Sequence, residues 1–475
     1  MHNKQVKWLD RKAELARLER VSSRRGGGLV VLWGRRRVGK TRLLLEWVHR
    51  AGGVYFVADE SSPAFQRRRL AEAIDTRLPG FGRVEYRDWG GLFERLARDA
   101  RQAKLHGPIV IDELPYLVRG SPDLPATLQR FVDHEAKEAR LVLALAGSSQ
   151  RMMQGLVLGA ESPLYGRAHE AFEVRPLPPE FLGDALGLRD PVATVRAFSV
   201  WGGLPRYWEL ASEWADLREA VDAIVLNPAG ALHDEPSRLL LEELPPAMTL
   251  RPILDAIGSG AHRITEIPGR IGSPTTALAG PMARLTGLGL VFRETPFGEP
   301  ERSTKRALYR LSDPFLRLWF SLVAPKRALL AQVPKKARLA LFDAREPHLV
   351  AACWEELCRA AVPQLGRELG ADFGPAKRYW GGSGPEWDVV AETADGQALL
   401  VAEAKWSSAR AAGASLLDAH AALVRKGLGP FGERRSVLRA LFVPEMPRRS
   451  SSSLPADVRV IDARTVIAAL SRVGD

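Results

Sequence analysis

The chain has 475 residues, too many for one ordinary hydrophobic core, and its 46% hydrophobic and 26% charged residues are typical of a folded protein of several domains. No run of about 18 uncharged apolar residues occurs and the N-terminus lacks the apolar core of a signal peptide, so we expect no membrane-spanning helix and a cytoplasmic location. The formal net charge of +12 is compatible with a polyanionic partner, but it does not identify one.

The first predicted elements are an apolar strand over residues 29–33 and a helix that follows a glycine-rich loop. The loop reads GRRRVGKT, which fits the pattern G-x-x-x-x-G-K-[ST] in the strand, loop and helix context that it requires. Such a loop wraps around a phosphate with its N–H groups pointing inward, while Lys40 reaches the β- and γ-phosphates and Thr41 ligates Mg²⁺. The predicted nucleotide-binding residues of the loop are Gly34, Arg35, Arg36, Arg37, Val38, Gly39, Lys40 and Thr41.

Two later apolar strands end in residues that suit the same site. Residues 109–111 lead into Asp112 and Glu113, and in proteins with such a loop the aspartate holds Mg²⁺ while the glutamate orients or deprotonates water. A third strand ends at Ser148, which lies near the γ-phosphate if the strands are neighbours. The alternatives are an acidic helix cap for Asp112 and Glu113 and an ordinary loop residue for Ser148.

These strings, together with SPLYGR and WGGLPRYW, resemble the archaeal-type ATPases of the STAND branch of AAA-related P-loop proteins, and they follow in the same order. The resemblance implies ATP as the nucleotide. It also makes Arg167 the charge-stabilising arginine, supplied by the same chain or by a neighbouring subunit of a nucleotide-dependent homo-oligomer. One departure lies near the N-terminus, where an Arg-Glu pair is expected but the sequence reads Arg11-Lys12, with Glu14 further on.

Residues 238–335 contain three short helical patterns and then two strand patterns around the turn FGEP, which is the layout of a winged helix. The third helix is expected to begin near Ser273, a typical capping residue. Thr275, Thr276 and Arg284 are exposed candidates for DNA contact. A module that docks a protein, or the ATPase domain of the same chain, fits the pattern equally well.

The last segment, residues 339–475, is predicted to hold a helix, a hairpin around the turn ETADGQ, a second helix and two further strands. The hairpin brings Asp388 close to Glu403 and Lys405, which are two positions apart and therefore share one face of a strand. Two carboxylates placed in this way can hold a divalent metal that polarises a phosphodiester, and Lys405 adds positive charge near the attacking water. Glu355, on the preceding helix, is a further candidate ligand of the metal or of water.

This order of elements resembles the PD-(D/E)xK nuclease superfamily, in particular the C-terminal domain that follows archaeal ATPases of this kind. The resemblance implies Mg²⁺, with Mn²⁺ as an alternative at this site, and a nucleic-acid substrate, with DNA favoured. A nuclease fold that has lost its activity and an exposed Glu403–Lys405 pair are the two alternatives.

Two functions follow from these patterns. The first is an ATP-hydrolysing switch that controls a DNA-directed nuclease, and the second is a signalling or transcription-regulating ATPase whose winged helix binds DNA or a protein trigger and whose terminal domain is inactive. Both have the same expected fold class, a multidomain α/β protein. Its parts are a parallel-sheet P-loop core (1–175), a helical lid (176–237), a winged helix (238–335) and a PD-(D/E)xK-like α/β domain (339–475).

Overall fold

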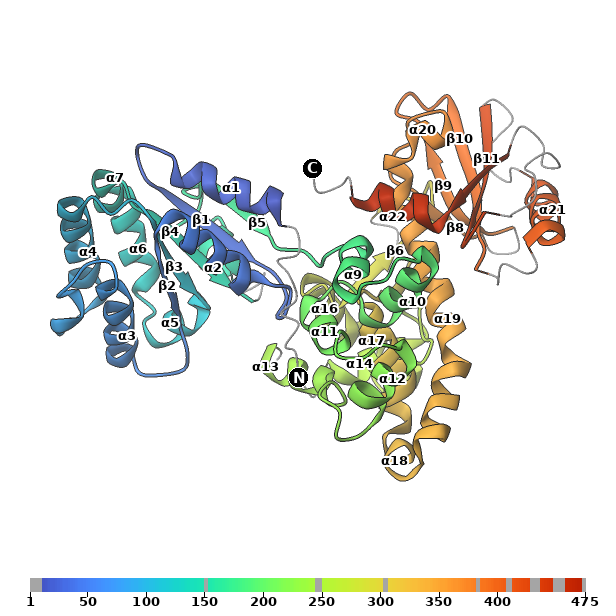
Figure 1. Cartoon of the computed structure of the whole chain (residues 1–475), viewed down its shortest axis with the longest axis horizontal. Coiled ribbons are helices and arrows are strands. Elements are labelled where there is room, and N and C mark those ends of the chain that lie inside the picture. The colour runs from blue at the N-terminus through green and yellow to red at the C-terminus, as the bar shows by residue number, and fades with distance from the viewer. Residues whose placement is uncertain are drawn as a thin grey trace. The chain divides into compact units, whose positions relative to one another are not determined.

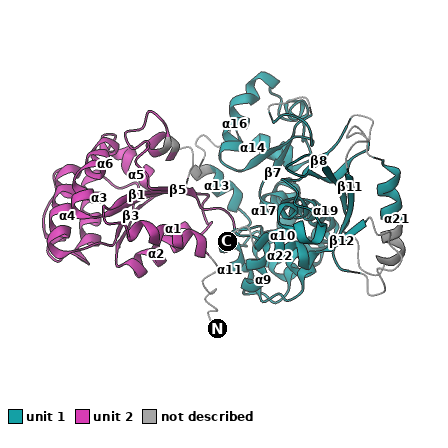
Figure 2. Cartoon of the chain, turned by 90° about the horizontal axis from the view of Figure 1, so that it is seen from above, with its two compact units in different colours: residues 1–9, 177–475 teal, residues 10–176 magenta. Residues whose placement is uncertain are grey.

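The computed structural model describes residues 11–148, 153–243, 250–301, 306–381, 385–406, 412–427, 436–446 and 458–471. The chain divides into two compact units, one of which contains Asp10–Pro176 and the other Leu177–Asp475 (Figure 2). Within the described ranges, no helix has both the length and the apolar character needed to cross a bilayer.

The first unit is built on five parallel strands in the order β2-β3-β4-β1-β5. Strands buried on both faces need continuous apolar runs, and β1, β3 and β4 have them. The predicted parallel-sheet P-loop fold is therefore confirmed, and β4 lies between β1 and β3. The strands are β1 (Gly28–Trp33), β2 (Val54–Val57), β3 (Pro108–Asp112), β4 (Val142–Gly147) and β5 (Glu170–Glu173).

Helices cover both faces of this sheet (Figure 1). Leu29 and Val31 of β1 pack with the helices between β2 and β4, whereas the helix that precedes β1 packs against the one that follows it. Alternate residues of one strand therefore serve two different helical layers. The helices are α1 (Lys12–Ser22), α2 (Lys40–Ala51), α3 (Pro63–Asp75), α4 (Trp89–Ala103), α5 (Leu114–Gly120), α6 (Leu124–Asp133) and α7 (Glu135–Ala139).

The second unit begins with short helices, several of which start at a proline. Proline favours the first helical turn because its fixed φ suits the helix and its missing N–H would lack an intrahelical partner there. This explains why prolines recur through residues 176–237. The helices are α9 (Pro179–Leu186), α10 (Pro191–Trp201), α11 (Pro205–Ala211), α12 (Leu217–Val221) and α13 (Glu235–Glu243).

The next part of this unit contains short helices and one antiparallel hairpin. The helix expected near Ser273 begins with a 3₁₀ turn at Thr275 and continues as an α-helix from Ala279. In the hairpin, Val291 pairs with Leu311 and Glu294 with Leu308. The elements are α14 (Arg251–Gly258), α15 (Ile267–Ile271), α16 (Ala279–Gly287), β6 (Val291–Glu294), β7 (Leu308–Leu311), α17 (Pro314–Leu318), the π-helical turn η6 (Trp319–Val323) and α18 (Ala324–Gln332).

The unit ends in a mixed five-stranded sheet of order β12-β11-β10-β9-β8, which confirms the predicted C-terminal α/β fold. The strands β8, β9 and β10 pair antiparallel, whereas β10, β11 and β12 pair parallel. One face packs on α19, α22 and Val195 of α10, and the other on Leu423 of α21. The elements are α19 (Lys335–Ala361), α20 (Gly366–Leu369), β8 (Lys377–Tyr379), β9 (Trp387–Glu392), β10 (Ala398–Ala404), α21 (Ala412–Arg425), β11 (Ser436–Val443), β12 (Val458–Asp462) and α22 (Ala463–Ser471).

Candidate functional site

The glycine-rich loop joins β1 to α2 and has a backbone that depends on its glycines. Gly34 has φ of 153°, and a Cβ atom there would lie 2.4 Å from the carbonyl oxygen of Val174, so no other residue fits. Lys40 is buried at the start of α2, and its ammonium donates to the carbonyls of Gly34 at 2.6 Å and Arg35 at 3.2 Å. The lysine ammonium is therefore held over the backbone of the loop itself.

Asp112 lies at the carboxyl end of β3 and is buried. Its Oδ2 accepts hydrogen bonds from the hydroxyl of Thr41 at 3.1 Å and from that of Tyr55 at 2.8 Å. A hydroxyl and a carboxylate are oxygen ligands of the kind that Mg²⁺ prefers, so the donor set of Thr41 and Asp112 fits this ion. Tyr55, on the neighbouring β2, was not predicted. Burial and then the charge of Asp112 raise the pKa of Tyr55, which keeps it a donor.

Glu113 follows directly and has φ of 57°, a conformation that is uncommon outside glycine and that concentrates at functional sites. Its N–H donates to Asp112 Oδ1 at 2.9 Å, and its carboxylate accepts from the hydroxyl of Ser148 at 3.1 Å. Because β3 and β4 are neighbours, the ends of the two strands bring Glu113 and Ser148 together. Their catalytic roles stay a prediction.

An arginine–glutamate pair does form near the N-terminus, across three residues rather than between neighbours. Arg11 is 6% exposed and its guanidinium lies 2.8 Å from Glu14 Oε1. The same group donates at 2.8 Å to the carbonyls of Val38 and Arg175, so it ties the glycine-rich loop to the segment after β5. The spacing of three, which places both side chains on one face of a helical turn, is the signal that could have found it.

Arg167, predicted to stabilise charge on the nucleotide, is held by Asp133 at the end of α6. Its Nε lies 2.9 and 3.0 Å from the two carboxylate oxygens, and its Nη1 donates to the carbonyl of Pro163 at 2.8 Å. The hydrogen bond and charge of Arg167 lower the pKa of Asp133. The role of Arg167 stays a prediction, and to fulfil it the guanidinium would have to leave this carboxylate.

A second group of candidate residues lies at the carboxyl end of β10. Glu403 is 3% exposed, and both of its carboxylate oxygens accept from ammonium groups. Lys405 donates to Oε2 at 2.7 Å and Lys426, just after α21, donates to Oε1. Lys426 also donates to the carbonyl of Glu386 at 2.8 Å. A buried carboxylate is costly unless it is paired, and the two lysines supply that pairing. Lys426 was not predicted.

Asp388 lies on β9, next to the strand that carries Glu403, and its Oδ2 accepts from the N–H of Ala404 at 3.0 Å. Burial and then the charge of Glu403 raise the pKa of Asp388, while burial and then the charge of Asp388 raise that of Glu355. Burial opposes the charge of Lys405, but its hydrogen bond to Glu403 and the surrounding carboxylates raise its pKa. The four predicted residues therefore act on one another electrostatically.

Within the described part of the chain, no three side chains of His, Cys, Asp or Glu are grouped closely enough to hold a metal ion. Two carboxylates, Asp388 and Glu403, were predicted as the metal ligands, and their burial and mutual repulsion are conditions that a divalent cation relieves. The donor set therefore fits a divalent cation in its chemistry. Lys426 would have to release one oxygen of Glu403.

Arg359 of α19 connects this acidic cluster to the hairpin β6–β7. Its Nη1 donates to the carbonyl of Asp388 at 2.9 Å and lies 3.7 Å from Glu355, while its Nη2 lies 3.6 Å from Glu294 of β6. The segment between β6 and β7 adds two further bonds to the C-terminal sheet, from the N–H of Phe297 to the carbonyl of Arg378 and from the indole of Trp380 to the carbonyl of Arg306. The hairpin is thus fastened beside the cluster.

The predicted DNA contacts lie on other elements of the same unit. Thr275 and Thr276 are exposed in the 3₁₀ turn before α16, and Arg284 is half-buried within α16. Their role stays a prediction.

Two protein families match separate parts of the chain. The family described as an ATPase domain found predominantly in archaea matches residues 8–207, which include every candidate residue of the nucleotide site. The family DUF234, described as archaeal and bacterial proteins of unknown function, matches residues 319–416. That second range contains Glu355, Asp388, Glu403 and Lys405, whereas Lys426 lies beyond it.

Individual proteins resemble larger parts of the chain. The uncharacterized protein MJECL04 of Methanocaldococcus jannaschii is 26% identical over 408 residues, which is 84% of this chain and 87% of that protein. The Walker-type ATPase PABY2304 of Pyrococcus abyssi has a TM-score of 0.52 at 21% identity and covers 66% of this chain and 95% of its own. The ORC2 protein of Aeropyrum pernix in its ADPNP–ADP complexes has a TM-score of 0.45 at 17% identity, over 72% and 93% of the two chains.

The Pyrococcus likeness shows a common fold, and the family match over residues 8–207 agrees with the buried lysine, threonine and aspartate of the loop and β3. These residues have the types and the placement that nucleotide hydrolysis by a P-loop protein needs. Residues 8–207 therefore form a P-loop ATPase domain that is similar to the ATPase domains found predominantly in archaea.

Proposed function

We propose that the protein is an ATP-driven switch whose C-terminal domain is a metal-dependent nuclease acting on DNA. The observation that carries the proposal is the burial of Glu403, at 3% exposure, at the end of an apolar strand with Asp388 on the next strand. Burying a carboxylate costs free energy that an apolar side chain would not cost, so its presence favours a functional role.

The order of elements around Glu403 supports the same proposal. A long helix, α19, precedes three antiparallel strands, and a second helix, α21, leads to β11, which pairs parallel with β10. This is the order that the resemblance of the sequence to the PD-(D/E)xK superfamily implies. In it, the acidic residue and the lysine of the E-x-K string stand on the last strand of the antiparallel set.

On the ATPase side, we infer that Thr41 and Asp112, whose side chains are 3.1 Å apart, would hold the Mg²⁺ that accompanies the phosphates of ATP. Lys40 then exchanges its two loop carbonyls for phosphate oxygens. Glu113 orients the attacking water and Ser148 holds the Glu113 carboxylate in place. Arg167 completes the site when it leaves Asp133.

On the nuclease side, a divalent cation held by Asp388 and Glu403 supplies Lewis-acid polarisation of the phosphodiester when bound. Lys405 keeps a positive charge beside the reacting phosphate, which its raised pKa favours. Arg359 holds the backbone of Asp388 and thereby positions the carboxylate, and Glu355 accepts a proton or orients water.

A second candidate function is supported by Lys426. With Lys405 and Lys426 both on Glu403, each oxygen of that carboxylate already has a cationic donor, which suits a domain that is inactive as a nuclease. In that case the protein is a signalling or transcription-regulating ATPase, and α14, α15, α16 and the hairpin β6–β7 form a winged helix that binds DNA or a protein.

A cleavage assay separates the two functions. The intact protein is incubated with single- and double-stranded DNA and with RNA, in Mg²⁺ or Mn²⁺, with ATP, with a non-hydrolysable analogue or with neither. Lys40→Ala and Asp112→Asn should abolish ATP turnover, whereas Glu403→Ala and Lys405→Ala should abolish cleavage and leave turnover intact.

If no substrate is cut under any of these conditions while ATP turnover is normal, the nuclease assignment fails. The winged-helix function then predicts DNA affinity that falls with salt at a slope of about −0.9 per neutralised phosphate. Thr276→Glu and Arg284→Ala should weaken it.

A further inference from the structure

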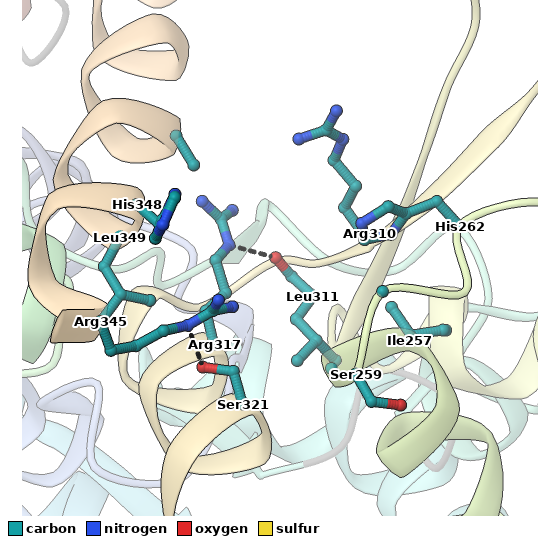
Figure 3. A pocket seen from close by; sticks show the side chains of 13 residues that line it. Ile257, Ser259, His262, Arg310, Leu311, Arg317, Ser321, Arg345, His348 and Leu349 are labelled. Atoms are coloured by element: carbon teal, nitrogen blue, oxygen red, sulfur yellow. Dashed lines mark hydrogen bonds between the residues drawn. The ribbon is translucent and has the colours of Figure 1, made fainter. Parts of the chain in front are cut away.

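A cavity of about 390 Å³ lies within the second unit, between α14, β7, the turn η6 and α19 (Figure 3). Three arginines and two histidines line it, and no carboxylate does. Its floor is apolar and its rim includes exposed residues of α19 and of the turn after α14. The size is typical of a site for a small ligand. The charged side chains of the lining are those of Arg310, Arg317 and Arg345, and the histidines are His262 and His348.

Close packing of two helices creates one wall of this cavity. Gly258 ends α14, and a Cβ atom at this position would lie 2.3 Å from the Cβ of Phe320 in η6. The backbones of α14 and η6 can therefore come this close only with glycine at position 258. Ile257 and Ser259, on either side of Gly258, line the cavity together with residues of α19.

Arg345 is the group that distinguishes the cavity from an ordinary polar crevice. Its Nε donates to the hydroxyl of Ser321 at 3.0 Å, and among the residues that the structure describes no carboxylate lies within ion-pair distance of it. Figure 3 shows its guanidinium near the side chains of His348 and Arg317. A guanidinium presents five N–H donors in a planar fork, and one hydroxyl satisfies only one of them.

The positive charges of the other two arginines that line the cavity are partly balanced by carboxylates. Arg317 donates to Glu356 at 2.7 Å and to the carbonyl of Leu311 at 2.7 Å, and Arg310 Nε lies 3.1 Å from Glu294. Neither the Arg310 Nε nor the Glu294 Oε2 makes a hydrogen bond, so their alignment is poor. Burial lowers the pKa of Arg310 and of His262. Burial also opposes the charge of Arg317, but the pairing with Glu356 raises the pKa of this arginine.

We propose that this cavity binds a small organic phosphate. Arg345 and His348 hold the phosphate group, with Arg317 and Arg310 contributing charge. A guanidinium suits this task because it matches phosphate oxygens bidentately. Ile257, Leu311 and Leu349 supply the apolar surface on which the organic part lies.

The site has a direct connection to the acidic cluster, although its existence does not depend on the nuclease assignment. Arg317 pairs with Glu356, the neighbour of Glu355 in α19. Glu294, the partner of Arg310, also pairs with Arg359, which holds the backbone of Asp388. An anion that draws either arginine into the cavity therefore changes the pairing of residues that position the cluster.

Calorimetry on the intact protein tests the site, in a Lys40→Ala background that weakens phosphate binding by the ATPase loop. Ribose 5-phosphate is titrated at constant ionic strength, with ribose and inorganic phosphate as the two comparison ligands. Ribose 5-phosphate should bind once per chain at millimolar concentration or below, inorganic phosphate more weakly, and ribose should give no heat.

Arg345→Ala should weaken the binding of ribose 5-phosphate by about tenfold or more, because it removes a charged hydrogen-bond donor. His348→Glu, at the exposed rim, is a second variant with the same expected direction. Lys336→Ala is the matched control, since it removes one exposed positive charge from the same helix and does not line the cavity.

The proposal is overturned if ribose 5-phosphate gives no heat at millimolar concentration. It is also overturned if Arg345→Ala, with unchanged circular dichroism and melting temperature, binds as the background protein does. Binding of a 5′-phosphorylated oligonucleotide without any binding of ribose 5-phosphate would likewise overturn the assignment to a small ligand.

Discussion

The two lysines on Glu403 should contribute unequally to stability, and the difference can be measured. Lys426 is 29% exposed and Lys405 is 50% exposed, whereas their shared partner Glu403 is 3% exposed. A hydrogen bond to a charged group stabilises a protein by about 1.5–3 kcal/mol when it is screened little. Lys426→Met should therefore cost about 2 kcal/mol. Lys405→Met should cost at most about 1 kcal/mol, because water screens an exposed pair more strongly.

These free energies translate into small but resolvable changes in melting temperature. The unit that contains the pair spans Leu177–Asp475, so its entropy of unfolding is about 0.6 kcal/mol/K at the usual value per residue. Lys426→Met should then lower its Tm by about 3 °C and Lys405→Met by about 1.5 °C or less. The Tm of each variant is measured by scanning calorimetry in EDTA. A separate scan with Mg²⁺ and an ATP analogue identifies the transition of the first unit, which the nucleotide should raise most.

The variant that loses less stability, Lys405→Met, should lose more DNA cleavage activity. Lys405→Met should abolish cleavage, whereas Lys426→Met frees an oxygen of Glu403 and should leave cleavage intact or raise it. The reasoning is refuted if Lys405→Met lowers the Tm as much as Lys426→Met, or if neither variant changes it.

Three further predictions concern other contacts. Arg11→Ala should destabilise the first unit by about 2–3 kcal/mol in urea titrations and weaken ATP binding, because the glycine-rich loop loses its link; unchanged ATP affinity would contradict this. Arg167→Ala should lower the kcat of ATP hydrolysis by about 10³-fold, whereas Asp133→Ala, which frees the arginine, should not; equal losses would make the pair purely structural. Gly258→Ala should cost about 1–3 kcal/mol by forcing Phe320 away, and a variant as stable as wild type would contradict the close approach.

The parts of the fold that the sequence predicts well are those encoded locally. The strands β1, β3 and β4 are short apolar runs, and each leads into candidate residues of the nucleotide site. One short stretch of sequence therefore predicts both the strand and the proposed role of the residues at its end. The hairpin β9–β10 was visible for a similar reason, because Asp395-Gly396 is a strong turn signal between two apolar strands.

Tyr55, Arg359 and Lys426 were not predicted because each depends on contacts between distant segments. Tyr55 reaches Asp112 only because β2 pairs with β3, and its own strand carries no motif. Arg359 contacts the backbone of Asp388 across 29 positions. A helical arginine in a chain rich in arginine gives no local sign of such a partner.

Lys426 shows why an E-x-K string alone cannot separate an active site from an inert one. The string fixes Lys405 on the face of Glu403 through the two-residue period of a strand, so that pairing follows from local geometry. The partner of the second carboxylate oxygen of Glu403 depends on α21. The end of this helix places Lys426, 23 positions further along the chain, where it donates to that oxygen. Whether that oxygen can be released to a cation decides between the two proposed functions. The choice between the two functions therefore depends on the length and placement of α21, which the E-x-K string does not encode.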